Sequence, residues 1–140
     1  MKQLLKLTGC LAVAGLFASC QSIQQEANYQ VIPLPQEIVV EQGAPFILKS
    51  GVKILYPEGN EKMQRNAQFL ADYLKTATGK DFAIEAGTEG KNAIVLTLGT
   101  ANENPESYQL KVAGDGITIT GPTEAGVFYG IQSLRKSLPV

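Results

Sequence analysis

The stretch that decides the fold runs from residue 107 to residue 138 and has the sequence SYQLKVAGDGITITGPTEAGVFYGIQSLRKSL. Its first part alternates apolar and polar side chains on both sides of Asp115-Gly116, a dipeptide typical of a two-residue hairpin turn. Alternation places one side of each strand against a core. The sequence therefore predicts two antiparallel strands within residues 107–120.

A helix is predicted directly after this hairpin. Thr123 follows Pro122 and is suited to cap the first free backbone amides of a helix. An apolar stripe then recurs at i, i+4, i+7 and i+11, which is one face of a helix. Pro139 is expected to end it. The stripe consists of Val127, Ile131, Leu134 and Leu138.

Gly126 and Gly130 lie one turn apart in this helix, and each lowers helix stability by about 1 kcal/mol relative to alanine. Close approach of the helix backbone to a neighbour would offset that loss. With Ser133 and Ser137 the two glycines form a narrow small-residue face. This face is predicted either to form a domain interface or to pack internally on the sheet, and the sequence leaves both open.

The preceding residues add strands and one strong helix. Asn60 and Gly79 are the cap signals of a helix over residues 61–78, whose apolar positions share one face. Residues 93–98 are continuously apolar and β-branched, as in a central strand. The predicted fold is α+β, an α/β sandwich with a mixed sheet and two helices packed on one face. The other predicted strands are residues 37–40 and 46–49, forming a hairpin, and residues 52–56 and 81–85.

The N-terminus has the pattern of a bacterial lipoprotein signal. Lys2 and Lys6 precede an apolar run over residues 7–17 that is too short to span a bilayer, and Cys20 follows small residues. We predict a signal peptide over 1–19, a lipidated tether over 20–30 starting at Cys20, and one domain over 31–140. Cys10 is an alternative lipidation site, and an ordinary secretory signal is an alternative to lipidation. The predicted location is the bacterial cell envelope, on a periplasmic or outer-membrane face.

Composition excludes several functions. The chain has no histidine, and both cysteines lie within the first twenty residues, so we expect no metal site, internal disulfide or cofactor. Loss of residues 1–19 would leave 10 basic against 13 acidic side chains. Nucleic acid is therefore not an expected partner, because its recognition needs a basic face.

Two motifs resemble a known family. The segment T-E-A-G-V-F-Y-G-I-Q-S-L-R at residues 123–135 and the segment I-P-L-P-Q-E at residues 32–37 resemble the end and the start of one domain. It is the non-catalytic N-terminal domain of bacterial family-20 glycoside hydrolases, the β-N-acetylhexosaminidases. The resemblance covers about residues 31–140. Related domains occur in α-glucuronidases and family-84 enzymes, so the resemblance indicates the type of domain more specifically than the activity of the parent enzyme.

The resemblance implies a parent enzyme that removes terminal N-acetylhexosamine from glycans. In that family an Asp-Glu pair on a (β/α)8 barrel acts with the substrate's own acetamido group. The barrel would follow this domain in the parent chain and would bind the glycan. No catalytic residue is assigned to this chain, which alone is not expected to be an enzyme. The alternative is a self-contained glycan-binding or interaction lipoprotein.

The carboxylates within the chain are expected to be structural. Glu58, Glu61 and Glu124 flank the predicted helix starts, where negative charge is favoured by the helix dipole. The polar segment 102–106 beside Tyr108 is interpreted as a loop, with sugar binding by hydrogen bonds and stacking as the alternative.

Overall fold

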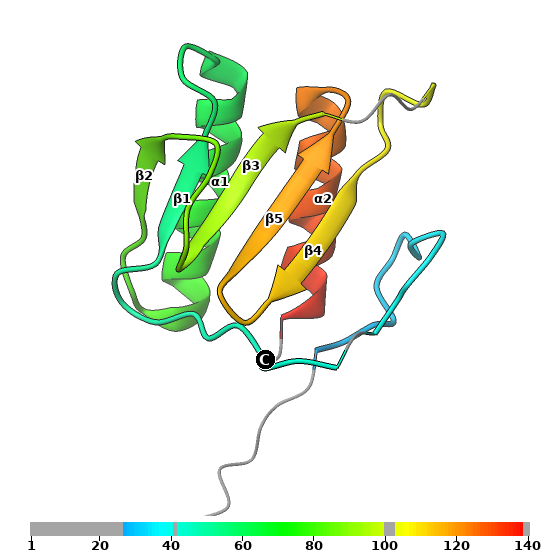
Figure 1. Ribbon diagram of the computed structural model, residues 1–140, viewed down its shortest axis with the longest axis horizontal. Coiled ribbons are helices and arrows are strands. Elements are labelled where there is room, and N and C mark those ends of the chain that lie inside the picture. The colour runs from blue at the N-terminus through cyan, green and yellow to red at the C-terminus, as the bar shows by residue number, and fades with distance from the viewer. Residues whose placement is uncertain (1–26, 41, 100–102, 139–140) are drawn as a thin grey trace, which may run out of the picture.

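Five strands form one mixed sheet in the computed structural model, which describes residues 27–40, 42–99 and 103–138. The order across the sheet is β2-β1-β3-β5-β4, so β3 is the central strand (Figure 1). The strands are β1 (Lys53–Tyr56), β2 (Ala83–Ala86), β3 (Ala93–Leu98), β4 (Gln109–Ala113) and β5 (Gly116–Gly121). The signal peptide, Cys20 and most of the tether predicted above lie outside the described residues.

Parallel and antiparallel pairings are combined in this sheet. β1 pairs in parallel with both β2 and β3, and β3 pairs in parallel with β5. β4 pairs antiparallel with β5, which makes the predicted hairpin. The predicted mixed sheet is confirmed.

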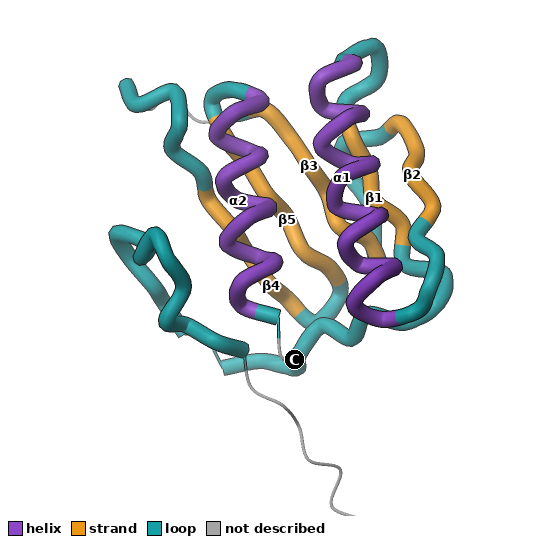
Figure 2. Tube along the Cα trace, turned by 180° about the vertical axis from the view of Figure 1, so that it is seen from behind, coloured by secondary structure: helices purple, strands orange, loops and turns teal. Residues whose placement is uncertain are grey.

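Both helices cover the same face of the sheet, as Figures 1 and 2 show from opposite sides. They are α1 (Glu61–Thr78) and α2 (Glu124–Ser137), and they run side by side over the strands. Since β1 leads into α1 and β5 leads into α2, the two helices begin at the same end of the sheet. The predicted two-helix layer on one face is confirmed.

Local signals set the limits of α1. The side chain of Asn60 accepts a hydrogen bond from the amide of Met63 at 3.0 Å, which satisfies a donor that the helix itself leaves free. At the other end Gly79 has φ +69°, the left-handed conformation that glycine adopts without steric cost. The predicted helix 61–78 is therefore confirmed with both caps.

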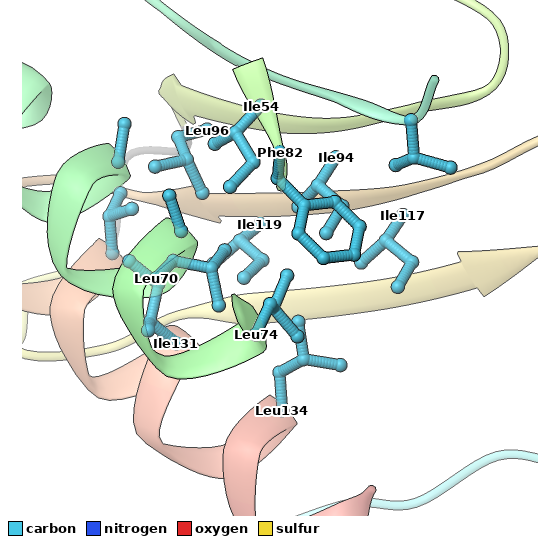
Figure 3. Close-up of a cluster of buried hydrophobic side chains, with 14 of the residues drawn as sticks. Ile54, Leu70, Leu74, Phe82, Ile94, Leu96, Ile117, Ile119, Ile131 and Leu134 are labelled. Carbon is cyan, nitrogen blue, oxygen red and sulfur yellow. The ribbon is translucent and has the colours of Figure 1, made fainter. Parts of the chain in front are cut away.

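The core lies between the sheet and the helices (Figure 3). Ile94 and Leu96 of β3 have no exposed surface and face the helix layer. Ala93 and Val95 of the same strand are also buried, together with Leu55 on the opposite face. β3 is thus buried on both faces, as its continuous apolar sequence predicts. The helices supply Met63, Ala67, Leu70, Ala71, Leu74, Val127, Ile131 and Leu134.

The structure corrects three predicted details. Residues 37–40 and 46–49 form no strand. Phe46 and Leu48 still pack against the core from a segment without regular secondary structure. This packing accounts for the alternation of apolar and polar residues there, although the segment makes no strand pairing. β2 occupies residues 83–86, two positions later at its start than predicted. The hairpin turn is Gly114-Asp115, because Gly116 already pairs with Ala113 in the sheet.

Candidate functional site

Polar side chains connect the starts of the two helices. Asn60 Nδ2 donates to Glu124 Oε1 at 3.1 Å, and Asn66 Nδ2 donates to the Glu124 carbonyl oxygen at 2.9 Å. Thr123 caps α2 by accepting from the amide of Gly126 at 3.2 Å. These bonds hold the N-termini of α1 and α2 side by side, at the end of the sheet where β1 and β5 finish. An open hollow of about 560 Å³ lies there, lined by Pro57, Glu58, Gly59, Asn60, Glu61, Lys62, Arg65 and Glu124.

The surroundings of Glu124 in this hollow do not suit a general acid. The pKa of Glu124 is lowered from its ordinary value by a hydrogen bond from its own backbone amide and by the bond from Asn60. A general acid for glycoside cleavage needs a raised pKa, so that it keeps its proton until transfer. Glu124 therefore works as a structural carboxylate at a helix start, as the sequence predicted for it.

The loop before β4, residues 103–108, makes hydrogen bonds to other parts of the domain. Tyr108 is half-buried, and its hydroxyl group shares a hydrogen bond with the hydroxyl group of Ser133 in α2. Thr123 Oγ1 donates to the carbonyl oxygen of Pro105. Since the Tyr108 side chain is engaged with the helix, these contacts favour the polar loop over the alternative sugar platform. Asn102 lies outside the described residues.

Gly126 and Gly130 are both buried inside the domain. A Cβ atom on Gly126 would overlap the carbonyl oxygen of Ser107, and one on Gly130 would overlap Cγ2 of Ile119. The small-residue face of α2 is thus turned toward the β4–β5 hairpin and the loop before it. Of the two roles left open above, these contacts favour internal packing.

The outer side of the helix layer instead carries aromatic rings. Phe69 of α1 and Phe128 of α2 lie with their ring centroids 5.2 Å apart, and Tyr129 follows at 6.3 Å from Phe128. The guanidinium group of Arg135 lies over Tyr73 at 4.2 Å and over Phe69 at 5.0 Å. We call these five residues the aromatic face. Phe69 and Tyr129 remain 36% and 40% exposed.

The sequence carries only a partial signal for the aromatic face. Phe69 and Tyr73 lie four residues apart beside the apolar stripe of α1, a spacing that places them on one side of the helix. Phe128 and Arg135 are seven residues apart in α2, which also puts them on one side. These two spacings were the available signal. What the sequence could not supply is the pairing of the two helices that brings them together.

Two further functions find no support among the described residues. No group of three or more His, Cys, Asp or Glu side chains in that part of the chain is placed to hold a metal ion. None of its helices is long and apolar enough to cross a membrane.

Comparison with known proteins identifies the domain. Residues 28–140 match the family described as glycosyl hydrolase family 20, domain 2. The chain is 30% identical over 138 residues to a beta-hexosaminidase of Porphyromonas gingivalis, covering 97% of this chain and 17% of that protein. It superposes on the GH20 beta-N-acetylhexosaminidase of Streptomyces coelicolor A3(2) with a TM-score of 0.71 and 34% identity, covering 81% of this chain and 23% of that one.

A more distant likeness concerns the fold alone. The protein CpGH84D shares 18% identity with this chain at a TM-score of 0.59, covering 79% of this chain and 22% of that one. The same fold therefore forms one part of that longer chain. By its own match the present chain belongs to glycosyl hydrolase family 20, as domain 2. It spans about a fifth of the length of the relatives it matches.

Proposed function

We propose that this chain is the non-catalytic accessory domain of a lipid-anchored β-N-acetylhexosaminidase. The observation that carries the proposal is the match of residues 28–140 to domain 2 of family 20, together with relatives that are themselves beta-hexosaminidases. The carboxylate bonded between the two helix starts agrees with a structural role, because its pKa is lowered rather than raised.

The chemistry of the parent enzyme would reside outside this chain. The resemblance implies an Asp-Glu pair on a (β/α)8 barrel that hydrolyses terminal N-acetylhexosamine with help from the substrate's acetamido group. This domain would stabilise and position the barrel. The aromatic face supports such a role, because it places two exposed aromatic side chains, Phe69 and Tyr129, in one patch with a half-buried arginine, and aromatic and arginine side chains are enriched in protein contacts.

Membrane attachment is part of the same proposal. The signal pattern before Cys20 supports lipidation of that residue, and residues 20–30 would then tether the domain to a membrane of the cell envelope. The parent enzyme would act on glycans at the surface to which it is anchored.

The test compares the parent protein with this domain alone. A variant beginning at residue 27 and ending at residue 140 should show no hydrolysis of aryl N-acetylglucosaminide or galactosaminide above background. The parent, obtained by following the reading frame beyond codon 140, should hydrolyse them. Turnover by the repurified domain, or a frame that holds no glycoside hydrolase domain, would contradict the proposal. Retention of a glycan by the domain alone would favour the self-contained binding lipoprotein.

A further inference from the structure

The second motif that carries the family resemblance lies in a part of the structure with an unusual surface. Residues 32–40, which we call the apolar arm, form no helix or strand. Their only charged side chain is Glu37, and their five large aliphatic side chains are between 43% and 86% exposed. These are five of the eleven exposed large hydrophobic residues in the described chain: Ile32, Leu34, Ile38, Val39 and Val40.

The arm is held at both ends and free between them. Before it, Val31 is buried and the amide of Asn28 donates to the carbonyl oxygen of Ser137 at 2.9 Å. After it, Phe46 and Leu48 pack against the core. Figure 1 shows the arm extending beyond the β4 edge of the sheet, away from the core. These flanking contacts therefore keep the apolar side chains of the arm near the domain without burying them in it.

A concentration of exposed aliphatic side chains of this kind marks a contact with another molecule or domain. We propose that the apolar arm docks on the catalytic domain of the parent enzyme. This contact would be in addition to the one proposed for the aromatic face. This inference rests on the proposed function, which supplies that partner, and adds the surface that the partner covers.

The position of the arm in the fold points to the catalytic domain as its binding partner. The hydrogen bond between Asn28 and Ser137 joins the root of the arm to the last turn of α2. In the proposed parent the catalytic domain follows α2, so that domain begins beside the arm. The matched relatives have roughly four-fifths of their length outside the matched part, which is ample chain to cover it.

The charge of the arm argues against a membrane surface as its occupant. Segments that bind anionic bilayers carry lysine or arginine beside their apolar residues. Residues 32–40 contain neither, and Glu37 would be repelled. Docking on a protein surface requires only that the aliphatic side chains find a complementary apolar patch.

Hydrogen exchange of the arm amides tests the proposal directly. The amides of residues 36–40 should exchange at least about tenfold more slowly in the parent enzyme than in the 140-residue chain, because docking protects a segment that is otherwise open. The double variant Val39→Thr/Val40→Thr should restore fast exchange in the parent and lower its thermal unfolding midpoint. The same variant should leave the midpoint of the 140-residue chain unchanged.

Val112→Thr is the matched control, because Val112 is an exposed valine, at 54%, on the edge strand β4 and outside the arm. It should leave arm exchange unchanged in the parent. Equally fast exchange in the parent and the isolated chain would overturn the proposal, as would equal sensitivity to both variants. Slower exchange of the isolated chain on phosphatidylglycerol vesicles, or at high protein concentration, would assign the arm to a membrane or a second copy instead.

The outcomes separate this inference from the proposed function. A parent that hydrolyses aryl N-acetylglucosaminide while its arm exchanges rapidly would overturn the docking of the arm alone. A reading frame without a glycoside hydrolase domain would overturn both.

Discussion

Tyr108 and Ser133 share a hydrogen bond between their hydroxyl groups, which joins the residue before β4 to the middle of α2. Ser133 is buried, and the ring of Tyr108 lies against the position where Gly130 lacks a side chain. The bond is therefore possible only because α2 approaches the hairpin closely at the glycines. One polar contact and two small residues together set the distance between helix and sheet on this side of the domain.

The Tyr108–Ser133 bond should appear as coupling in a double-mutant cycle. Tyr108→Phe leaves the buried Ser133 hydroxyl without this partner, and we expect a loss of about 1–3 kcal/mol in the free energy of unfolding. Ser133→Ala should also destabilise the domain. The double variant should lose clearly less than the sum of the two, because both single changes remove the same bond. Strictly additive losses in urea unfolding would mean that the bond contributes nothing.

Alanine at either helix glycine should destabilise the domain by itself. In an exposed helix position the change from glycine to alanine would gain about 1 kcal/mol, so the sign of the effect tests the packing. Gly126→Ala should be the more harmful, because its Cβ meets the backbone oxygen of Ser107, whereas that of Gly130 meets a side chain. We expect losses of about 1–3 kcal/mol by overpacking.

Gly43→Ala is the control for these variants, because no atom lies within 4 Å of the added carbon and its φ is not in the left-handed region. Its unfolding free energy should stay within about 0.5 kcal/mol of the unchanged chain. A gain in unfolding free energy from Gly130→Ala would indicate that Gly130 lies on an exposed helix face, and would favour its role at a domain interface.

Local signals were enough to predict the elements whose limits are set by nearby residues. The cap at Asn60 and the left-handed Gly79 lie at the ends of α1, so its range could be taken from the sequence. Residues 37–40 show why a pattern of β-formers is insufficient. A strand needs a neighbour to bond, and the described residues provide none beside this segment. Likewise, the direction in which Gly130 faces depends on Ile119 and Tyr108, which only the fold brings to it.

Membrane attachment should depend on Cys20. Cys20→Ser should move the protein from the membrane pellet to the soluble periplasmic or culture fraction, because the thiol that carries the lipid is lost. Cys10→Ser is the matched control and should leave the protein in the pellet. The reverse pattern would assign the lipid to Cys10. Soluble protein before any substitution would favour the ordinary secretory signal.

The contribution of Glu124 to stability should depend on pH in a defined direction. Its folded-state pKa is lowered by the hydrogen bond from its own amide and by that from Asn60, so the folded domain binds this proton more weakly than the unfolded chain does. The stability it provides is therefore present above its ordinary pKa of 4.5 and is lost as the pH falls through the lowered value. Glu124→Gln keeps an oxygen for Asn60 but cannot titrate, so the loss of unfolding free energy between neutral pH and about pH 3 should become smaller. Glu58→Gln removes one negative charge from the same end of the helices and controls for that loss. An unchanged pH profile in Glu124→Gln would show that the carboxylate makes no favourable contact in the folded state.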